Sequence, residues 1–352
     1  MIRPLPAFAL LALAALHPGT ARAETTLRIG WCARTISAAA TPFAVATKLG
    51  WFAKDGLKIE LVPLPGSVDC AKLVATRELP YALASIEAVP VLHAQGVAIR
   101  NYYTAYQGNI YGIAVPQGSP IKTLADLKGK RIGVIAMASG GYVVARALAA
   151  SIGLNPDTDM KIVVAGEGAQ TAALIRSGQI DALSQFDTQY ALVENAGVKL
   201  TYIDSGAIAK FPSNGFIALE DHLKANRAQA VALARNYAMA TVFTMANPEA
   251  GIHAMWDIYP ASRGTGRDDA TALRDDTHTI QARLKNLRPE AGGVTRWGEN
   301  SIPNYQAYLD YLLANKVIPQ KANATDLLDN SLIDDINRFD TEAIIAMAKA
   351  AK

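Results

Sequence analysis

The sequence predicts an α/β fold in which two successive sets of strands and helices are followed by a helical region. Three observations support this prediction. Strand-like apolar segments alternate with helical ones from Leu27 to Ser85, the same alternation begins again after Val115, and only helical patterns follow Glu220. Strands separated by helices form parallel βαβ units, whose sheet is covered by helices on both faces.

The expected elements follow in chain order. The first set should contain strands at residues 27–31, 57–62 and 81–85, with helices at 39–53 and 68–76. The second set begins with a segment at 111–115 and should contain strands at 131–135, 161–164 and 180–184, helices at 141–152, 169–177 and 187–195, and a closing strand at 215–219. Helices are then expected at 223–246, 248–259, 268–284, 302–315 and 341–351. Helices alone cannot close a sheet edge, so this last region should pack on the first set.

The first 23 residues have the pattern of a secretory signal peptide. Arg3 precedes an apolar stretch at 5–16, a break at Pro18-Gly19, and the small-x-small sequence Ala21-Arg22-Ala23. About twelve apolar residues are too few to span a bilayer, so we expect cleavage after Ala23 rather than a membrane anchor. A lipid anchor would need a cysteine directly after the cleavage point, but the first cysteine is Cys32. We therefore expect a free periplasmic protein.

Composition narrows the possible function. The chain has 352 residues, of which 51% are hydrophobic and 18% charged, as in well-buried globular proteins of two ordinary domains. The formal net charge of +3 becomes +3 − 2 = +1 once Arg3 and Arg22 leave with the signal peptide. A nucleic-acid partner is not expected, because it would require a concentrated basic face.

A possible anion site lies at the start of the helix expected after the strand at 131–135. This helix opens on Ser139-Gly-Gly-Tyr142, where the first amides are uncovered. Free amides at the positive end of the helix dipole attract anions.

Three segments resemble the substrate-binding proteins of nitrate/sulfonate/taurine-type ABC importers, which share their fold with thiamine-pyrimidine-precursor binders. These segments are 44–61, with its Gly-Trp-Phe helix ending and the following strand, 121–134 and 175–183. One departure occurs at Thr76-Arg-Glu-Leu-Pro-Tyr-Ala82, where the family usually has a Ser-Gly-x-x-Asp-x-Ala turn.

The resemblance implies a two-lobed periplasmic binding protein fold of type II-like architecture, with ligand enclosed between the lobes. Two crossover strands should fall near 111–115 and 214–219. The implied division is residues 24–112 with 218–352 for lobe 1 and 113–217 for lobe 2. Implied partners are a small organic anion and a permease with its ATPase, and the protein is expected to be a monomer.

Candidate ligand contacts follow from a rule for parallel sheets, whose binding crevice lies beyond the carboxyl ends of the strands. In lobe 1 the candidates are Trp31, Arg34, Thr35, Ser67 and Ser85, and in lobe 2 they are Ser139, Gly140, Gly141, Tyr142, Gln185, Phe186 and Asp187.

Several of these candidates have a simpler structural interpretation. The Ser139 segment can be a helix cap, Arg34 a solvated arginine, and Trp31 and Tyr142 core residues. Glu87 and Asp187 at helix starts are expected mainly as partners of the helix dipole.

The expected ligand is a small organic anion, with an aromatic carboxylate ranked before a sulfonate. Helix N-termini and the Arg34 guanidinium would supply the donors, while Trp31, Tyr142 and Phe186 would supply apolar surface. A neutral heterocycle such as a pyrimidine precursor remains the alternative.

An enzyme on the same fold is a less favoured possibility, and no cofactor or metal is expected. The histidines after the signal peptide, His93, His222, His253 and His278, are not at metal-ligand spacing. No HExxH, GxSxG or Walker sequence occurs. A receptor sensor domain would need a membrane-spanning segment, and no stretch after the signal peptide has that pattern.

The chain has 2 cysteines, Cys32 and Cys70, and we expect them to form a disulfide. Adjacent parallel strands would bring their loops together, and the periplasm is oxidising. Two buried thiols are the alternative.

Overall fold

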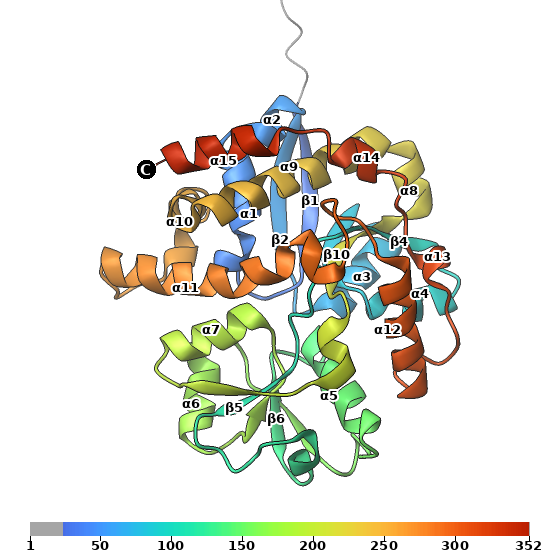
Figure 1. Cartoon of the computed structure of the whole chain (residues 1–352), viewed down its shortest axis with the longest axis vertical. Coiled ribbons are helices and arrows are strands. Elements are labelled where there is room, and N and C mark those ends of the chain that lie inside the picture. Colours follow the sequence, from blue (N-terminus) through green and yellow to red (C-terminus); the bar gives the residue numbers. More distant parts are fainter. Residues whose placement is uncertain (1–23, 352) are drawn as a thin grey trace, which may run out of the picture.

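The computed structural model describes residues 24–351, which form two α/β lobes one above the other in Figure 1. The expected signal peptide lies outside the described residues. Each lobe is built on a five-stranded sheet. This confirms the two-lobed fold predicted from the sequence.

The sheet of lobe 1 has the strand order β2-β1-β3-β10-β4. Its strands are β1 (Thr25–Trp31), β2 (Leu57–Pro63), β3 (Tyr81–Ser85), β4 (Ile99–Thr104) and β10 (Asn214–Leu219). β1 pairs in parallel with β2 and β3, whereas β10 runs antiparallel to both β3 and β4. The sheet is therefore mixed rather than wholly parallel.

The sheet of lobe 2 has the order β7-β6-β8-β5-β9. Its strands are β5 (Ile113–Pro116), β6 (Arg131–Val134), β7 (Lys161–Val164), β8 (Ala182–Leu183) and β9 (Leu200–Ile203). β6 is parallel to β7 and β8, and β5 is antiparallel to β8 and β9. Both sheets are thus parallel at one side and antiparallel where the chain crosses between lobes.

Two features of this topology correct the sequence prediction. The segment at 215–219 does not close the second set, because β10 inserts between β3 and β4 of the first sheet. The chain therefore returns to lobe 1 at Asn214, a few residues before the expected boundary at 217/218. β4 and β9 were not predicted. β4 is obscured by polar residues, of which Asn101 and Thr104 are fully buried and share hydrogen bonds with Asn300.

Helices cover both lobes. In lobe 1, α1 (Thr41–Lys48), α2 (Trp51–Lys54), α3 (Ser67–Ala75) and α4 (Ala88–Ala94) alternate with the first strands. Lobe 2 carries α5 (Gly140–Ser151), α6 (Ala169–Arg176) and α7 (Asp187–Asn195). Among residues 24–351 no helix has the length and apolar character needed to cross a membrane.

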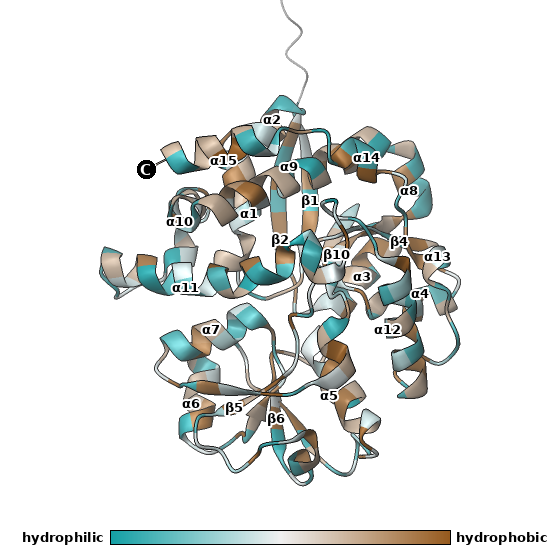
Figure 2. Cartoon of the chain, in the orientation of Figure 1, coloured by the Kyte–Doolittle hydropathy of each residue, from teal (hydrophilic) through white to brown (hydrophobic). Residues whose placement is uncertain are grey.

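The C-terminal helices return to lobe 1, as predicted. They are α8 (Glu220–Ala225), α9 (Arg227–Ala246), α10 (Pro248–Ile258), α11 (Asp269–Leu287), α12 (Ile302–Ala314), α13 (Ala324–Leu327), α14 (Ile333–Ile336) and α15 (Thr341–Ala350). α9 lies in the core, where the Tyr237 ring packs 5.0 Å from that of Phe43 and 5.2 Å from that of Phe216. Figure 2 shows hydrophilic residues along α11 and α7, the helices that face each other across the lobes.

A disulfide joins Cys32, directly after β1, to Cys70 in α3, with 5.9 Å between the two Cα atoms. The structure thus contains the bonded form rather than two buried thiols. The bond fixes the loop after β1, which is one wall of the space between the lobes.

We predict that replacing both cysteines with alanine lowers the free energy of unfolding by roughly 3 to 4 kcal/mol. The reason is that the bond constrains a loop of 38 residues in the unfolded chain. Denaturant unfolding of oxidised wild type and variant measures the difference. Reduced wild type is the control, because it lacks the bond but keeps both cysteine side chains, including the buried Cys70. The same unfolding midpoint for oxidised and reduced wild type would contradict the prediction.

Candidate ligand-binding site

The loops that were expected to hold ligand meet one another directly across the cleft. The Val68 amide of lobe 1 donates to the Ala138 carbonyl of lobe 2 at 3.1 Å. A Cβ atom at Gly66 would lie 2.3 Å from the same Ala138 oxygen, and one at Gly140 would lie 2.5 Å from the Tyr111 hydroxyl. The structure therefore shows the closed arrangement of the two lobes.

A small cavity remains between the lobes, with a volume of about 30 Å³. This is room for roughly one water molecule and not for an organic ligand. Its lining is mostly aromatic and aliphatic, and consists of Trp31, Cys32, Ala33, Ser37, Ala39, Leu83, Tyr106, Ile110, Tyr111, Phe186, Asn214 and Arg283. Binding of any organic molecule here requires the lobes to separate.

Arg283 is the one charged residue that lines this cavity. It projects from α11 of lobe 1, is only 2% exposed, and lies over the Tyr106 ring at 4.0 Å. Its Nε and Nη2 atoms donate to Asp187 Oδ1 of lobe 2 at 2.8 and 2.6 Å. Asn286 donates to the other carboxylate oxygen of Asp187 at 2.8 Å. A buried ion pair thus joins the two lobes at the cavity wall.

The charge of Arg283 is retained in this buried position. Burial lowers the pKa of the guanidinium, but the Asp187 carboxylate outweighs this effect and raises that pKa overall. A pair of opposite charges with these hydrogen bonds offsets much of the cost of desolvation.

Two of the expected contacts in the first loop are made differently from the prediction. The Arg34 residue is exposed, and its backbone amide, rather than its guanidinium, donates to Glu167 of lobe 2 at 3.1 Å. The Thr35 hydroxyl donates to the other oxygen of the Glu167 carboxylate. Arg34 and Thr35 therefore lie at the cleft mouth as a contact between lobes, and Trp31 lines the cavity with its Nε1 bonded to the Thr35 carbonyl at 2.7 Å.

The expected serines act as structural hydrogen-bond partners in the closed form. The Ser67 hydroxyl accepts from the Ser85 amide at 2.9 Å. Ser139 caps α5 by accepting from the Tyr142 amide at 3.3 Å and donates to Ala136. All three are buried at the contact between the lobes.

The remaining predicted residues of lobe 2 divide into three groups. Phe186 lines the cavity, and Asp187 reaches it through Arg283. Gly141 packs inside lobe 2, because a Cβ there would lie 2.2 Å from the Ser184 carbonyl, and Gln185 bonds Gly166 and Thr171. Tyr142 lines a separate outer groove beside Arg146.

Sequence reasoning missed Arg283, Tyr106 and Asn214, which all line the cavity. Asn214 lies in a crossover segment that was predicted, so its place in the site could have been anticipated. Arg283 lies inside a predicted helix far from the strand ends, and the sequence pattern does not separate it from a surface arginine.

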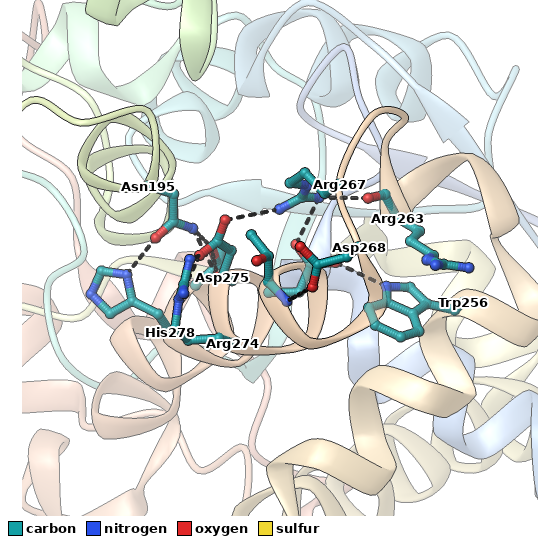
Figure 3. A network of polar contacts seen from close by, with 11 residues as sticks. Asn195, Trp256, Arg263, Arg267, Asp268, Arg274, Asp275 and His278 are labelled. Atoms are coloured by element: carbon teal, nitrogen blue, oxygen red, sulfur yellow. Dashed lines mark hydrogen bonds and ion pairs between the residues drawn. The ribbon is translucent and has the colours of Figure 1, made fainter.

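A second polar network joins α7 of lobe 2 to α11 of lobe 1 (Figure 3). Asn195 at the end of α7 donates through Nδ2 to the Asp275 carbonyl of α11 at 2.8 Å, and its Oδ1 accepts from His278 Nδ1 at 2.8 Å. Asp275 also pairs with Arg267 at 3.3 Å. Within residues 24–351, no group of three or more His, Cys, Asp or Glu residues is placed to hold a metal ion.

The two lobes, the crossing strands and the aromatic cavity between them are the features of a two-lobed periplasmic binding protein fold. Residues 37–251, more than half of the chain, match the family model described as NMT1/THI5 like, and the chain belongs to this family. This family assignment agrees with the resemblance found in the sequence. No curated protein matches the chain at a significant level.

Solved structures share the fold at low sequence identity. A protein of Bordetella bronchiseptica RB50 is 21% identical with a TM-score of 0.71, covering 89% of this chain and 97% of its own. The alkanesulfonate-binding protein SsuA from Xanthomonas axonopodis pv. citri, bound to MOPS, is 18% identical with a TM-score of 0.62, covering 87% and 99%. The periplasmic nitrate-binding protein NrtA from Synechocystis PCC 6803 is 15% identical with a TM-score of 0.58, covering 94% and 99%.

We predict that Gly66→Ala holds the lobes apart without unfolding either of them. Gly66 has an extended backbone with φ of 178°, which alanine adopts, but its new Cβ would meet Ala138 of the opposite lobe. Under conditions in which the wild type is closed, small-angle scattering should give a larger radius of gyration for the variant, while circular dichroism stays the same. An unchanged radius of gyration would show that the close approach at Gly66 does not limit closure.

Proposed function

We propose that this chain is a periplasmic substrate-binding protein that captures a small organic anion between its lobes and delivers it to an ABC import permease with its ATPase. The ligand class is an aromatic carboxylate or sulfonate. The observation that supports this most strongly is Arg283, a guanidinium that is the one charged group lining an otherwise aromatic and aliphatic cavity.

Opening of the lobes would turn Arg283 into an anion receptor. The guanidinium is held on lobe 1 by α11 and Tyr106, whereas its partner Asp187 belongs to α7 of lobe 2. Separation of the lobes leaves the guanidinium without its carboxylate in a cleft of low polarity. A ligand carboxylate or sulfonate can then take the place of Asp187, because both groups accept paired hydrogen bonds from a guanidinium.

The aromatic side chains favour a ring on the ligand. Trp31, Tyr106, Tyr111 and Phe186 surround the cavity from both lobes. When the lobes close, these rings would cover the apolar part of a ligand and exclude water from the ion pair.

The transport cycle in this proposal follows from the chain topology. The chain crosses between the lobes twice, before β5 and before β10, so residues 24–112 and 214–352 would move against 113–213. Export through cleavage after Ala23 and action as a monomer belong to the same proposal.

We predict that benzoate, phthalate or benzenesulfonate raises the melting temperature of the mature protein, whereas benzamide, a neutral isostere of benzoate, does not. A ligand at about 100 times its dissociation constant stabilises a protein by about 2.7 kcal/mol, which thermal shift detects. Stabilisation by benzamide and not by the anions would contradict the anion assignment and favour the neutral heterocycle.

We predict that Arg283→Lys weakens binding of the stabilising anion by roughly tenfold or more, because a bidentate charged contact contributes about 1.5 to 3 kcal/mol. Isothermal titration calorimetry measures the dissociation constant. Arg235→Lys is the matched control, since Arg235 also pairs with an aspartate, Asp55, but lies away from the cleft. The double variant Arg283→Met/Asp187→Asn removes both buried charges and serves if the single variant does not fold. Full affinity in these variants would place the anion elsewhere.

We predict that the lobes open and close in solution. Small-angle scattering of the ligand-free protein should show a radius of gyration above that of the closed structure, and saturation with the stabilising anion should reduce it. A radius of gyration that does not respond to saturating anion would contradict the hinge motion.

A further inference from the structure

Glu87 is a buried carboxyl group with no cationic partner at the cleft edge of lobe 1. It follows the end of β3 by two residues and is 2% exposed. Its Oε1 atom accepts a hydrogen bond from the Tyr308 hydroxyl of α12. Among the described residues its Oε2 atom has no hydrogen-bond partner. This contrasts with Asp187, the other buried carboxyl group at the cleft, which pairs with Arg283.

The groups around Glu87 are uncharged. Those that face it are the phenols of Tyr308 and Tyr305 on α12 and of Tyr111 before β5, together with the Ser85 hydroxyl. Burial raises the pKa of all three phenols, so they remain neutral near neutral pH. Glu87 directly precedes α4, which packs against α3, β4 and α13. The charged residues of these three elements are Asp69, Lys72, Arg100 and Asp326, and none of the four forms an ion pair with Glu87.

An ionised Glu87 would be costly in this environment. A buried carboxylate without a cation loses its hydration and gains little in return. Burial accordingly raises the pKa of the Glu87 carboxyl group, and hydrogen bonding with Tyr308, with its own backbone and with the Ser85 hydroxyl only partly offsets this. The neutral acid carries one O–H donor, and the unpartnered Oε2 is the atom available to hold it.

Glu87 lies beside the contact that must part when a ligand enters. Ser85 and Tyr111, its neighbours, are the residues that a Cβ atom on Gly140 would meet, at 3.1 Å from Ser85 Oγ and 2.5 Å from Tyr111 Oη. Gly140 is the first residue of α5 in lobe 2. Separation of the lobes therefore uncovers the neighbourhood of Glu87 from the side on which ligand arrives.

We propose that Glu87 is a specificity-determining residue that binds the ligand anion as a neutral acid, with its Oε2 hydroxyl donating a hydrogen bond to the anionic group. This rests on the proposed anion-binding function. An ionised Glu87 would repel the same anion, so capture and protonation of Glu87 are coupled. The closed, liganded protein therefore holds a proton that the open protein releases at higher pH.

The sign of the pH dependence follows from this coupling. In this proposal, burial of Glu87 on closure raises its pKa above that of the open form, so affinity is full below the pKa of the open form. Between the pKa of the open form and that of the closed form, affinity falls by about tenfold per pH unit, because one proton is taken up with each ligand.

Benzenesulfonate is the appropriate probe, because it remains an anion from about pH 5 to about pH 9, whereas the carboxyl groups of aromatic acids titrate close to the lower end. Calorimetry of the mature wild type should show affinity falling with rising pH. The Glu87→Gln variant carries a permanent neutral donor of the same shape, and its affinity should not change with pH. Titrations in two buffers of different ionisation enthalpy should count about one proton taken up by wild type and none by the variant.

The outcomes separate this inference from the proposed function. A wild type that binds benzenesulfonate through Arg283 with no proton uptake would overturn the role of Glu87 and leave the anion-binding proposal standing. The same pH profile in wild type and Glu87→Gln would also overturn it. Absence of benzenesulfonate binding at every pH overturns, for aromatic sulfonates, both the anion-binding proposal and the role of Glu87. If Glu87→Gln does not fold, the proton count on wild type alone decides.

Discussion

The ion pair between Arg283 and Asp187 is the interaction on which the closed arrangement of this protein depends. It is buried, bidentate and shared between the two lobes. Removal of one partner from such a pair leaves a buried charge unpaired, which costs several kcal/mol, whereas the intact pair contributes little net stability. The pair is therefore well suited to a reversible contact, because the buried guanidinium is stable only when an anionic group, such as the Asp187 carboxylate, faces it.

The rest of the lobe contact is consistent with reversible closure. It includes hydrogen bonds between loops, close approaches at Gly66 and Gly140, and the polar contacts between α7 and α11. The large aromatic core around Phe43, Phe216 and Tyr237 lies within lobe 1 and not between the lobes. Apolar groups also meet between the lobes, where the Phe211 ring stacks on Tyr308 at 4.8 Å, so opening exposes apolar surface that a ligand can cover.

The sequence predicted those parts of the fold that depend on local pattern, and less of the site. Strands such as β1 and β6 carry apolar runs, and the helices have apolar faces, so both were recognised. β4 was missed because the buried partners of Asn101 and Thr104 come from residue 300, which no local pattern reveals. The two arginines show the same limit of sequence reasoning. Arg34 was predicted to contact ligand but is exposed at the cleft mouth, whereas Arg283 was not predicted but lines the cavity. The neighbours of the two arginines in the sequence do not reveal their roles, and only the contact with Asp187 makes Arg283 part of the site.

The position of β10 between β3 and β4 has a consequence for the order in which the protein can fold. Lobe 2 draws all its strands from one continuous segment of the chain, so its sheet can form without any later residue. Lobe 1 cannot, because β3 and β4 do not pair with each other and need β10 to bridge them. Until β10 (Asn214–Leu219) is available, both strands present an unpaired edge, which is a site of aggregation. Lobe 1 is therefore completed only after lobe 2, although it begins first in the sequence.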